Sequence, residues 1–123
     1  MSLQGKNVVI IGGTSGIGLA TAVMAQAAGA NVWAASRTQE KISHAAALHP
    51  LIQFSQVDTH DPDGLKALFA SVGPIDHLVG AATGATRTTA PFMDQTDDQF
   101  RAAFDKFWGY THVVRTCVPF LSE

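Results

Sequence analysis

An apolar run that breaks into glycines near the amino end constrains the fold of this chain more than any other feature. Residues 8–11 (Val-Val-Ile-Ile) are consecutive and β-branched, which indicates a strand buried on both faces. Gly12, Gly16 and Gly18 follow, and the next ten residues are good helix formers that stop at Gly29. A strand, a glycine turn and a helix in this order place free backbone N–H groups and the positive end of a helix dipole where a phosphate can bind.

Strand-like and helix-like segments alternate along the rest of the chain. We expect further strands at 31–35, 51–57 and 75–79, and further helices at 38–48, from the N-cap Asp61 to a stop at Gly73-Pro74, and from about 97 to 121. Such alternation implies parallel pairing through right-handed crossovers. The prediction is an α/β fold: a Rossmann-like, doubly wound parallel sheet of order 3-2-1-4, with its ligand crevice beyond the carboxyl ends of the first and fourth strands.

The length, net charge and composition of the chain argue against several classes of function. The 123 residues suit one domain, and a formal charge of −2 offers no electrostatic footprint for nucleic acid. No apolar run approaches the length of a membrane span, and the amino end does not resemble a signal peptide. Cys117 is the only cysteine, so we expect a core or interface thiol and a reducing cytoplasm. The five histidines show no metal-ligand spacing, and no metal site is expected.

The glycine spacing Gly12-x-x-x-Gly16-x-Gly18 resembles that of the short-chain dehydrogenase/reductase family, and the likeness extends from Leu3 to the last residue. It implies a nicotinamide dinucleotide and hydride transfer between that cofactor and a carbonyl or alcohol. The turn residues that this resemblance assigns to the cofactor are Gly12, Thr14, Ser15, Gly16, Ile17 and Gly18. The alternative is a turn that only lets the helix pack closely on the strand.

The residues after the second strand indicate which dinucleotide is bound. An NAD site usually offers Asp or Glu there to the ribose 2′-hydroxyl, whereas this chain has Ser36 and Arg37. A guanidinium pairs with a 2′-phosphate and a hydroxyl donates to it, so these residues favour NADP(H). The alternative for Arg37 is a solvated loop arginine.

Three further residues are assigned by the resemblance. Asp58, after the third strand, stands where the family has an aspartate that accepts from the adenine amino group; a turn cap is the competing interpretation. Residues 80–83 (Gly-Ala-Ala-Thr) replace the family's Asn-Asn-Ala-Gly and match it only at Ala82. Small residues at Ala81 and Ala82 still let the backbone approach the nicotinamide ribose.

The family's catalytic residues have no counterparts here. Family members use Tyr-x-x-x-Lys, a preceding Ser and a helical Asn, but the only tyrosine, Tyr110, is followed four residues later by Val114 and lies in a different helix. We therefore expect Tyr110 to be a packing residue and predict no catalytic residue. Lys106 is a possible remnant at the helical Asn position, its alternative being an ordinary exposed lysine.

The resemblance covers only the first half of the family domain, so we expect residues 1–123 to be a partial NADP(H)-binding domain that lacks the carboxyl-terminal catalytic half. Three functions follow as hypotheses: the cofactor half of an oxidoreductase, inactive alone; a non-catalytic nucleotide-sensing or interaction module; or one half of a split enzyme. We also expect a homo-oligomer, formed through an exposed edge strand (Ile75, Leu78, Val79), the last helix (Phe100, Phe104, Phe107, Trp108, Val114), or both.

Overall fold

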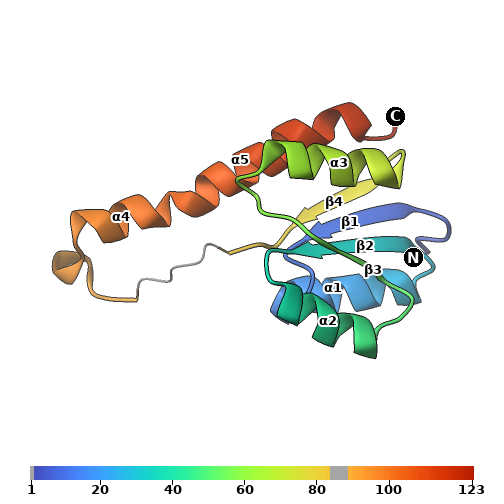
Figure 1. The fold of residues 1–123 in the computed structure, drawn as a ribbon, viewed down its shortest axis with the longest axis horizontal. Coiled ribbons are helices and arrows are strands. Elements are labelled where there is room, and N and C mark those ends of the chain that lie inside the picture. The colour runs from blue at the N-terminus through green and yellow to red at the C-terminus, as the bar shows by residue number, and fades with distance from the viewer. Residues whose placement is uncertain (1, 84–88) are drawn as a thin grey trace.

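A parallel sheet with helices on both faces forms the body of the molecule (Figure 1). The structure, a computed structural model, describes residues 2–83 and 89–123. In these residues the strands are β1 (Asn7–Ile11), β2 (Asn31–Ser36), β3 (Gln53–Gln56) and β4 (His77–Gly80). The helices are α1 (Gly16–Ala27), α2 (Gln39–Leu48), α3 (Pro62–Val72), α4 (Asp97–Ala103) and α5 (Asp105–Cys117), with 3-10 turns at η1 (Phe92–Asp94) and η2 (Val118–Phe120).

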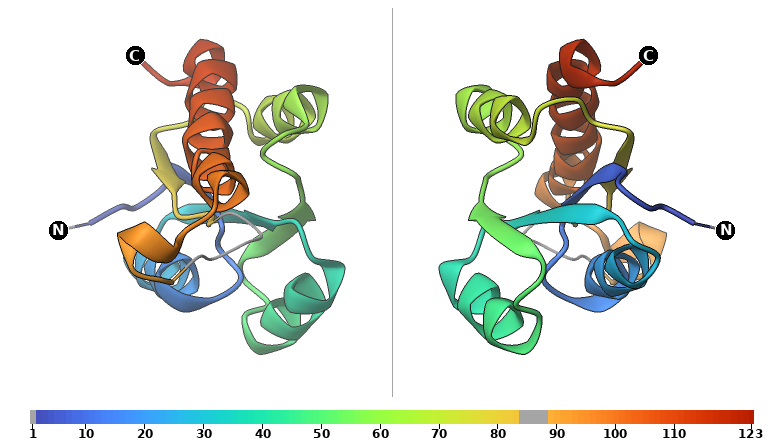
Figure 2. Two further views of the ribbon diagram at one scale, coloured as in Figure 1. Left: turned by 90° about the vertical axis from the view of Figure 1, so that its left-hand side faces the viewer. Right: turned by 90° about the vertical axis from the view of Figure 1, so that its right-hand side faces the viewer.

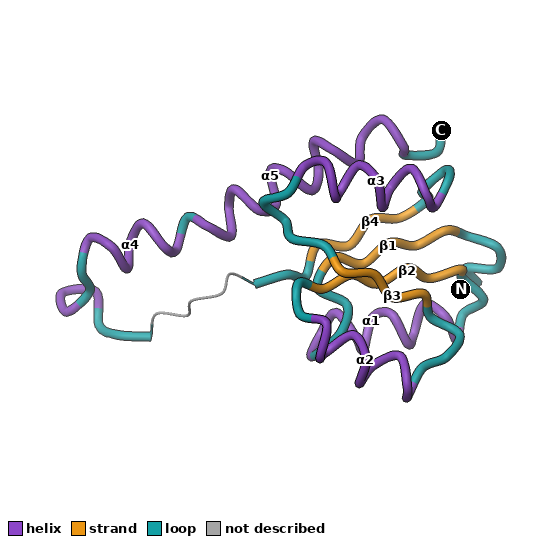
Figure 3. The backbone as a smooth tube through the Cα atoms, viewed as in Figure 1, coloured by secondary structure: helices purple, strands orange, loops and turns teal. Residues whose placement is uncertain are grey.

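The sheet has the order β3-β2-β1-β4, and all its pairings are parallel, which confirms the predicted Rossmann-like topology. β1 is the inner strand next to β4, and Ile11 pairs with Ala35 on one side and Gly80 on the other. The carboxyl ends of β1, β2 and β4 therefore meet at one edge of the sheet. The tube in Figure 3 shows the strand ends and the loops that leave them on this side.

Two apolar layers hold the sheet, one on each face. Val8 and Ile10 pack with Ala22 and Ala25 of α1, and α2 contacts β2 and β3, whereas Val9 and Ile11 pack with α3 and α5. Figure 2 shows these helix pairs on opposite sides of the sheet. Val8, Val9, Ile10 and Ile11 are each at most 3% exposed, so the continuous β-branched run forms a strand covered on both faces, as predicted.

Local signals set the ends of several helices. The Asp61 side chain accepts a hydrogen bond from the Gly64 N–H at 3.1 Å, and Pro62 occupies the first turn of α3, as predicted. Gly29 and Gly73 have φ of 94° and 85°, the left-handed region in which glycine ends a helix.

The prediction of one helix from 97 to 121 is wrong in two places. The helix divides at Phe104: α5 is held on the core by buried residues, whereas α4 has none, so nothing aligns α4 with the packed segment. α4 extends away from the sheet in Figure 1. At the other end, Pro119 cannot donate a backbone hydrogen bond, and the chain tightens into η2 after Cys117.

The prediction that Ile75 lies on an exposed edge is also wrong. Ile75 is fully buried and forms a parallel bridge with Leu121. Its N–H donates to the Phe120 carbonyl at 2.9 Å, and its carbonyl accepts from the Ser122 N–H at 2.8 Å. The chain that leaves α5 thus returns beside the start of β4, where it covers the backbone groups of Ile75.

Candidate functional site

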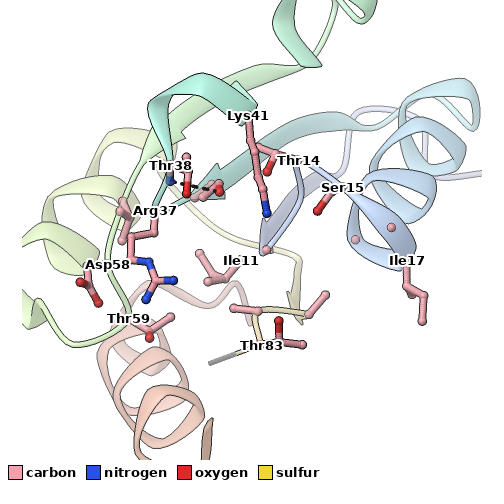
Figure 4. A pocket seen from close by; sticks show the side chains of 18 residues that line it. Ile11, Thr14, Ser15, Ile17, Arg37, Thr38, Lys41, Asp58, Thr59 and Thr83 are labelled. Carbon is pink, nitrogen blue, oxygen red and sulfur yellow. Dashed lines mark hydrogen bonds between the residues drawn. The ribbon is translucent and has the colours of Figure 1, made fainter. Parts of the chain in front are cut away.

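A cavity of about 730 Å³ opens at the carboxyl edge of the sheet, among the ends of the four strands and the starts of α1 and α2 (Figure 4). Eighteen residues line it: Ile11, Gly12, Thr14, Ser15, Gly16, Ile17, Gly18, Ala35, Ser36, Arg37, Thr38, Lys41, Val57, Asp58, Thr59, Ala81, Ala82 and Thr83. All eleven residues that the sequence assigned to a cofactor are among them. The topology therefore gathers residues up to 72 positions apart around one cavity.

The glycine turn forms one wall and is anchored to β2. The N–H groups of Gly12 and Gly13 donate to the Ala35 carbonyl at 2.8 and 3.1 Å. Gly12 has a φ of 91°, and a Cβ there would collide with the backbone of Ala82. A Cβ on Gly18 would overlap the carbonyl oxygen of Gly12. Glycine is required at both positions because backbone meets backbone.

The amino end of α1 faces the cavity without a competing acid. Ser15 is the N-cap, its side chain makes no capping hydrogen bond, and the first turn contains no acidic residue. The hydroxyl of Ser15 and the side chain of Thr14 are drawn beside the cavity in Figure 4. A helix end of this kind, with unpaired N–H groups and a positive dipole, suits a phosphate.

The end of β2 supplies a second polar wall. The Ser36 hydroxyl accepts from the Thr38 N–H at 3.4 Å, and the Arg37 carbonyl accepts from the Gln56 side-chain amide at 3.0 Å. Figure 4 shows the Arg37 guanidinium directed into the cavity. The sequence after β2 places no carboxylate here, and Arg37 forms no ion pair with any described residue.

Asp58 fits both interpretations that the sequence allowed. Its Oδ1 accepts from the His60 N–H at 2.9 Å, which is a turn cap, yet the half-buried residue also lines the cavity. On the β4 side, the Ala81 N–H donates to the Ile11 carbonyl at 2.7 Å. That bond brings the small residues Ala81 and Ala82 against the glycine turn.

Tyr110 and Lys106 lie outside the residues that line the cavity. The Tyr110 ring packs against Gly80, where an added Cβ would be 3.1 Å from Cε1, so it has the packing role that was predicted. Lys106 is exposed, with its Nζ 5.5 Å from the centre of the Tyr110 ring. Its assignment as a remnant of the helical Asn stays a prediction.

Sequence reasoning missed a cluster beside Asp58. His112 on α5 meets His60 edge-on, with the ring centroids 5.4 Å apart. Its Nδ1 lies 3.0 Å from the Thr59 carbonyl, and His60 Nε2 lies 2.7 Å from Asp105 Oδ1. These contacts join the loop of Asp58 and Thr59 to α5. The residues in contact are 45 or more positions apart in the sequence, so no local sequence pattern could have predicted them.

Residues 2–83 and 89–123 contain no cluster of three or more His, Cys, Asp or Glu placed to bind a metal ion. None of the helices found there has both the length and the apolar character needed to cross a membrane.

Known proteins resemble this chain in both sequence and fold. A family model described as short chain dehydrogenase matches residues 6–123. L-xylulose reductase of Mesocricetus auratus is 34% identical over 105 residues, and carbonyl reductase [NADPH] 2 of Sus scrofa is 30% identical over 105; each alignment covers 85% of this chain and 42% of the relative. A short-chain type dehydrogenase/reductase from Mycobacterium ulcerans shares the fold, with a TM-score of 0.87 at 23% identity, over 98% of this chain and 48% of that one. The chain thus spans less than half the length of these relatives.

Proposed function

Because the chain belongs to the short-chain dehydrogenase family, we propose that residues 1–123 form a partial Rossmann domain that binds NADP(H) as the cofactor half of a carbonyl or alcohol oxidoreductase. The proposal rests on one observation: all eleven residues that the sequence assigned to the cofactor line the same cavity. The printed name of the pig relative, carbonyl reductase [NADPH] 2, supports the same cofactor and substrate class.

Different residues of the cavity would bind different parts of this cofactor. The glycine turn and the N–H groups at the start of α1 would bind the pyrophosphate. Ser36 and Arg37 would bind the 2′-phosphate, Asp58 would accept from the adenine amino group, and Ala81 and Ala82 would admit the nicotinamide ribose. The cofactor, when bound, supplies or accepts the hydride.

The chain by itself should bind without turnover. Its only tyrosine, Tyr110, packs on Gly80 outside the cavity lining, and Val114 stands where a lysine partner would be needed. Without an acid positioned to protonate an alkoxide, hydride transfer to a carbonyl is not assisted. This observation favours, as a second candidate, a non-catalytic nucleotide-binding module.

Replacement of Arg37 tests the cofactor assignment. Wild-type protein should bind NADPH more tightly than NADH in a calorimetric titration, and Arg37→Gln should weaken NADPH binding about 10- to 100-fold while leaving NADH unchanged, because a charge-assisted hydrogen bond is worth about 1.5–3 kcal/mol. Arg115→Gln, an exposed arginine of α5 outside the cavity, is the matched control. Equal wild-type affinities for the two cofactors would contradict NADP(H), and binding of neither would contradict the site.

A homo-oligomer is part of the proposal. Phe104, Phe107 and Trp108 are 62%, 58% and 54% exposed along α4 and α5, which is unusual for large apolar side chains. Analytical ultracentrifugation should show a dimer or larger species, and Phe104→Ser with Trp108→Ser should dissociate it, whereas Met24→Ser on α1 should not. A wild-type monomer at micromolar concentration would refute the homo-oligomer.

A reducing compartment such as the cytoplasm suits Cys117, the only cysteine and a buried free thiol.

A further inference from the structure

The loop that follows β3 and contains Asp58 rests on one stripe of α5. The helix residues that contact the loop are Asp105, Gly109 and His112. They are four and three positions apart, so they lie on one face of the helix. On the loop side, Asp58 and Thr59 line the cavity, whereas no residue of α5 does. Figure 4 shows both side chains at the cavity, above the orange-red ribbon of α5. The stripe therefore acts on the cavity through the loop.

Three contacts hold the loop on this stripe. The His112 Nδ1 lies 3.0 Å from the Thr59 carbonyl oxygen, and because a carbonyl only accepts, the ring donates from Nδ1. Gly109 is buried, and a Cβ there would be 2.9 Å from the Thr59 Oγ1, so a larger residue would push the loop away. His60 Nε2 lies 2.7 Å from Asp105 Oδ1, and its ring meets the His112 ring edge-on. Moving the loop off α5 therefore breaks contacts of both Thr59 and His60.

The same contacts determine where the Asp58 carboxylate lies. Its Oδ1 accepts from the His60 N–H at 2.9 Å, and its backbone carbonyl accepts from the Asp61 N–H at 3.0 Å. On the other side, the Val57 N–H donates to the Ser36 carbonyl of β2 at 2.9 Å. Asp58 thus lies between a residue fixed to the sheet and a residue fixed to α5. Among the described residues no group donates to its second oxygen, Oδ2, which leaves that oxygen available to a ligand.

A carboxylate oxygen held in one place distinguishes the exocyclic groups of purines. It accepts a hydrogen bond from an amino group, whereas a carbonyl at the same position offers no donor and repels it. We propose that His112 and His60 are positioning residues that, through the loop, set how strongly the cavity prefers adenine to a base with a carbonyl in place of the amino group. Neither histidine lines the cavity, so each acts through Asp58. The inference rests on the proposed function, in which Asp58 accepts from the adenine amino group.

Two cofactors that differ at this group test the role of His112. NADPH carries adenine, and its deamino analogue carries hypoxanthine, which has a carbonyl in place of the amino group. Wild-type protein should bind NADPH at least about tenfold more tightly in a calorimetric titration, because the analogue loses a hydrogen bond to a carboxylate. His112→Phe keeps an aromatic ring without the donor and should reduce this preference to about threefold or less. His112→Asn places an amide nitrogen near the position of Nδ1 and should restore the preference.

The other histidine has its own matched pair of variants. His60→Gln carries an amide nitrogen that reaches Asp105 as Nε2 does, and it should keep the preference for NADPH, whereas His60→Leu should reduce it. The backbone N–H that donates to Asp58 remains in both variants, so the reduction should be smaller than for His112→Phe. His44→Phe is the control, since His44 is an exposed histidine of α2 that does not line the cavity.

The outcomes separate this inference from the proposed function. If the wild type prefers NADPH and His112→Phe retains that preference in full, only the inference fails. It also fails if His112→Phe weakens both cofactors by the same factor, or if His112→Asn loses the preference as His112→Phe does. If the wild type binds both cofactors equally, the adenine contact of the proposed function fails; if it binds neither, the whole NADP(H) site fails, and in both cases the inference fails too. Circular dichroism of each variant shows whether a loss of binding reflects a loss of fold.

Discussion

Replacing Gly18 with alanine tests whether the close approach of α1 to the glycine turn is a steric requirement. The added Cβ would overlap the Gly12 carbonyl oxygen and lie 3.2 Å from the Gly13 Cα. Neither neighbour is a flexible side chain that can rotate away. The first turn of α1 and the glycine turn would have to separate, which would loosen the packing of Ala22 and Ala25 on the sheet.

Two opposing effects determine how much Gly18→Ala lowers the free energy of unfolding. Overpacking of a rigid contact costs about 1–3 kcal/mol, and the upper end applies because both partners are backbone. Alanine in place of glycine inside a helix returns about 0.5–1 kcal/mol. The expected net loss in the free energy of unfolding is therefore about 2 kcal/mol. With a urea dependence of about 1–3 kcal/mol per molar, the unfolding midpoint should fall by about 1 M.

Gly16→Ala is the matched control, because it changes a glycine of the same turn without a clash. Gly16 has a φ of 55°, and an added Cβ meets nothing within 4 Å. Only conformational strain of about 1–2 kcal/mol applies, less about 0.4–1 kcal/mol from restriction of the unfolded chain. Its midpoint should therefore fall less than that of Gly18→Ala. A Gly18→Ala protein as stable as the wild type would refute the steric argument.

Three other predictions concern residues of the core and the segment after α5 that lies beside Ile75. The Asn7 N–H and the Ser122 hydroxyl, each 2.8 Å from an oxygen of Asp76, hold its pKa below the usual 3.8, so its contribution to stability is present above that value and is lost as pH falls through the lowered pKa. Asp76→Asn should thus lower the urea midpoint at neutral pH and reduce the further fall on acidification; an unchanged pH dependence would argue against this role. Burial raises the pKa of the Cys117 thiol, so a thiol reagent should label Cys117 only after unfolding, and rapid labelling of native protein would contradict its place in the core. Phe69→Ala removes a fully buried ring and should cost about 3–5 kcal/mol in urea unfolding, with a loss below 1 kcal/mol as the contrary result.

Much of the fold could be predicted because its signals are local. The β-branched run before Gly12 indicates a strand covered on both faces, and Asp61 with Pro62 indicates the start of α3. Alternation of strands and helices leads to parallel order through the handedness of crossovers, so the sheet order follows without any knowledge of contacts. The cavity residues were assigned largely from the resemblance to the family, and the structure places them around the carboxyl ends of the strands, which meet at one edge of the parallel sheet.

What the sequence could not supply depends on contacts between distant residues. The bridge of Ile75 to Leu121 and the His60 contact with His112 join residues 46 and 52 positions apart, and neither segment carries a periodic pattern that names its partner. The break at Phe104 likewise depends on which part of the helix finds a core to pack on.

The sequence by itself determined the glycine turn, the sheet order and the absence of an acid after β2, because these depend on residue type and spacing along a few positions. Only the tertiary structure decided that Lys41 faces the same cavity as Arg37 and that the start of β4 is covered. A side chain's direction depends on how its helix is set against the sheet, and that placement is fixed by packing over the whole core. The glycine turn thus predicts a phosphate site from sequence, and the fold decides which side chains surround that turn.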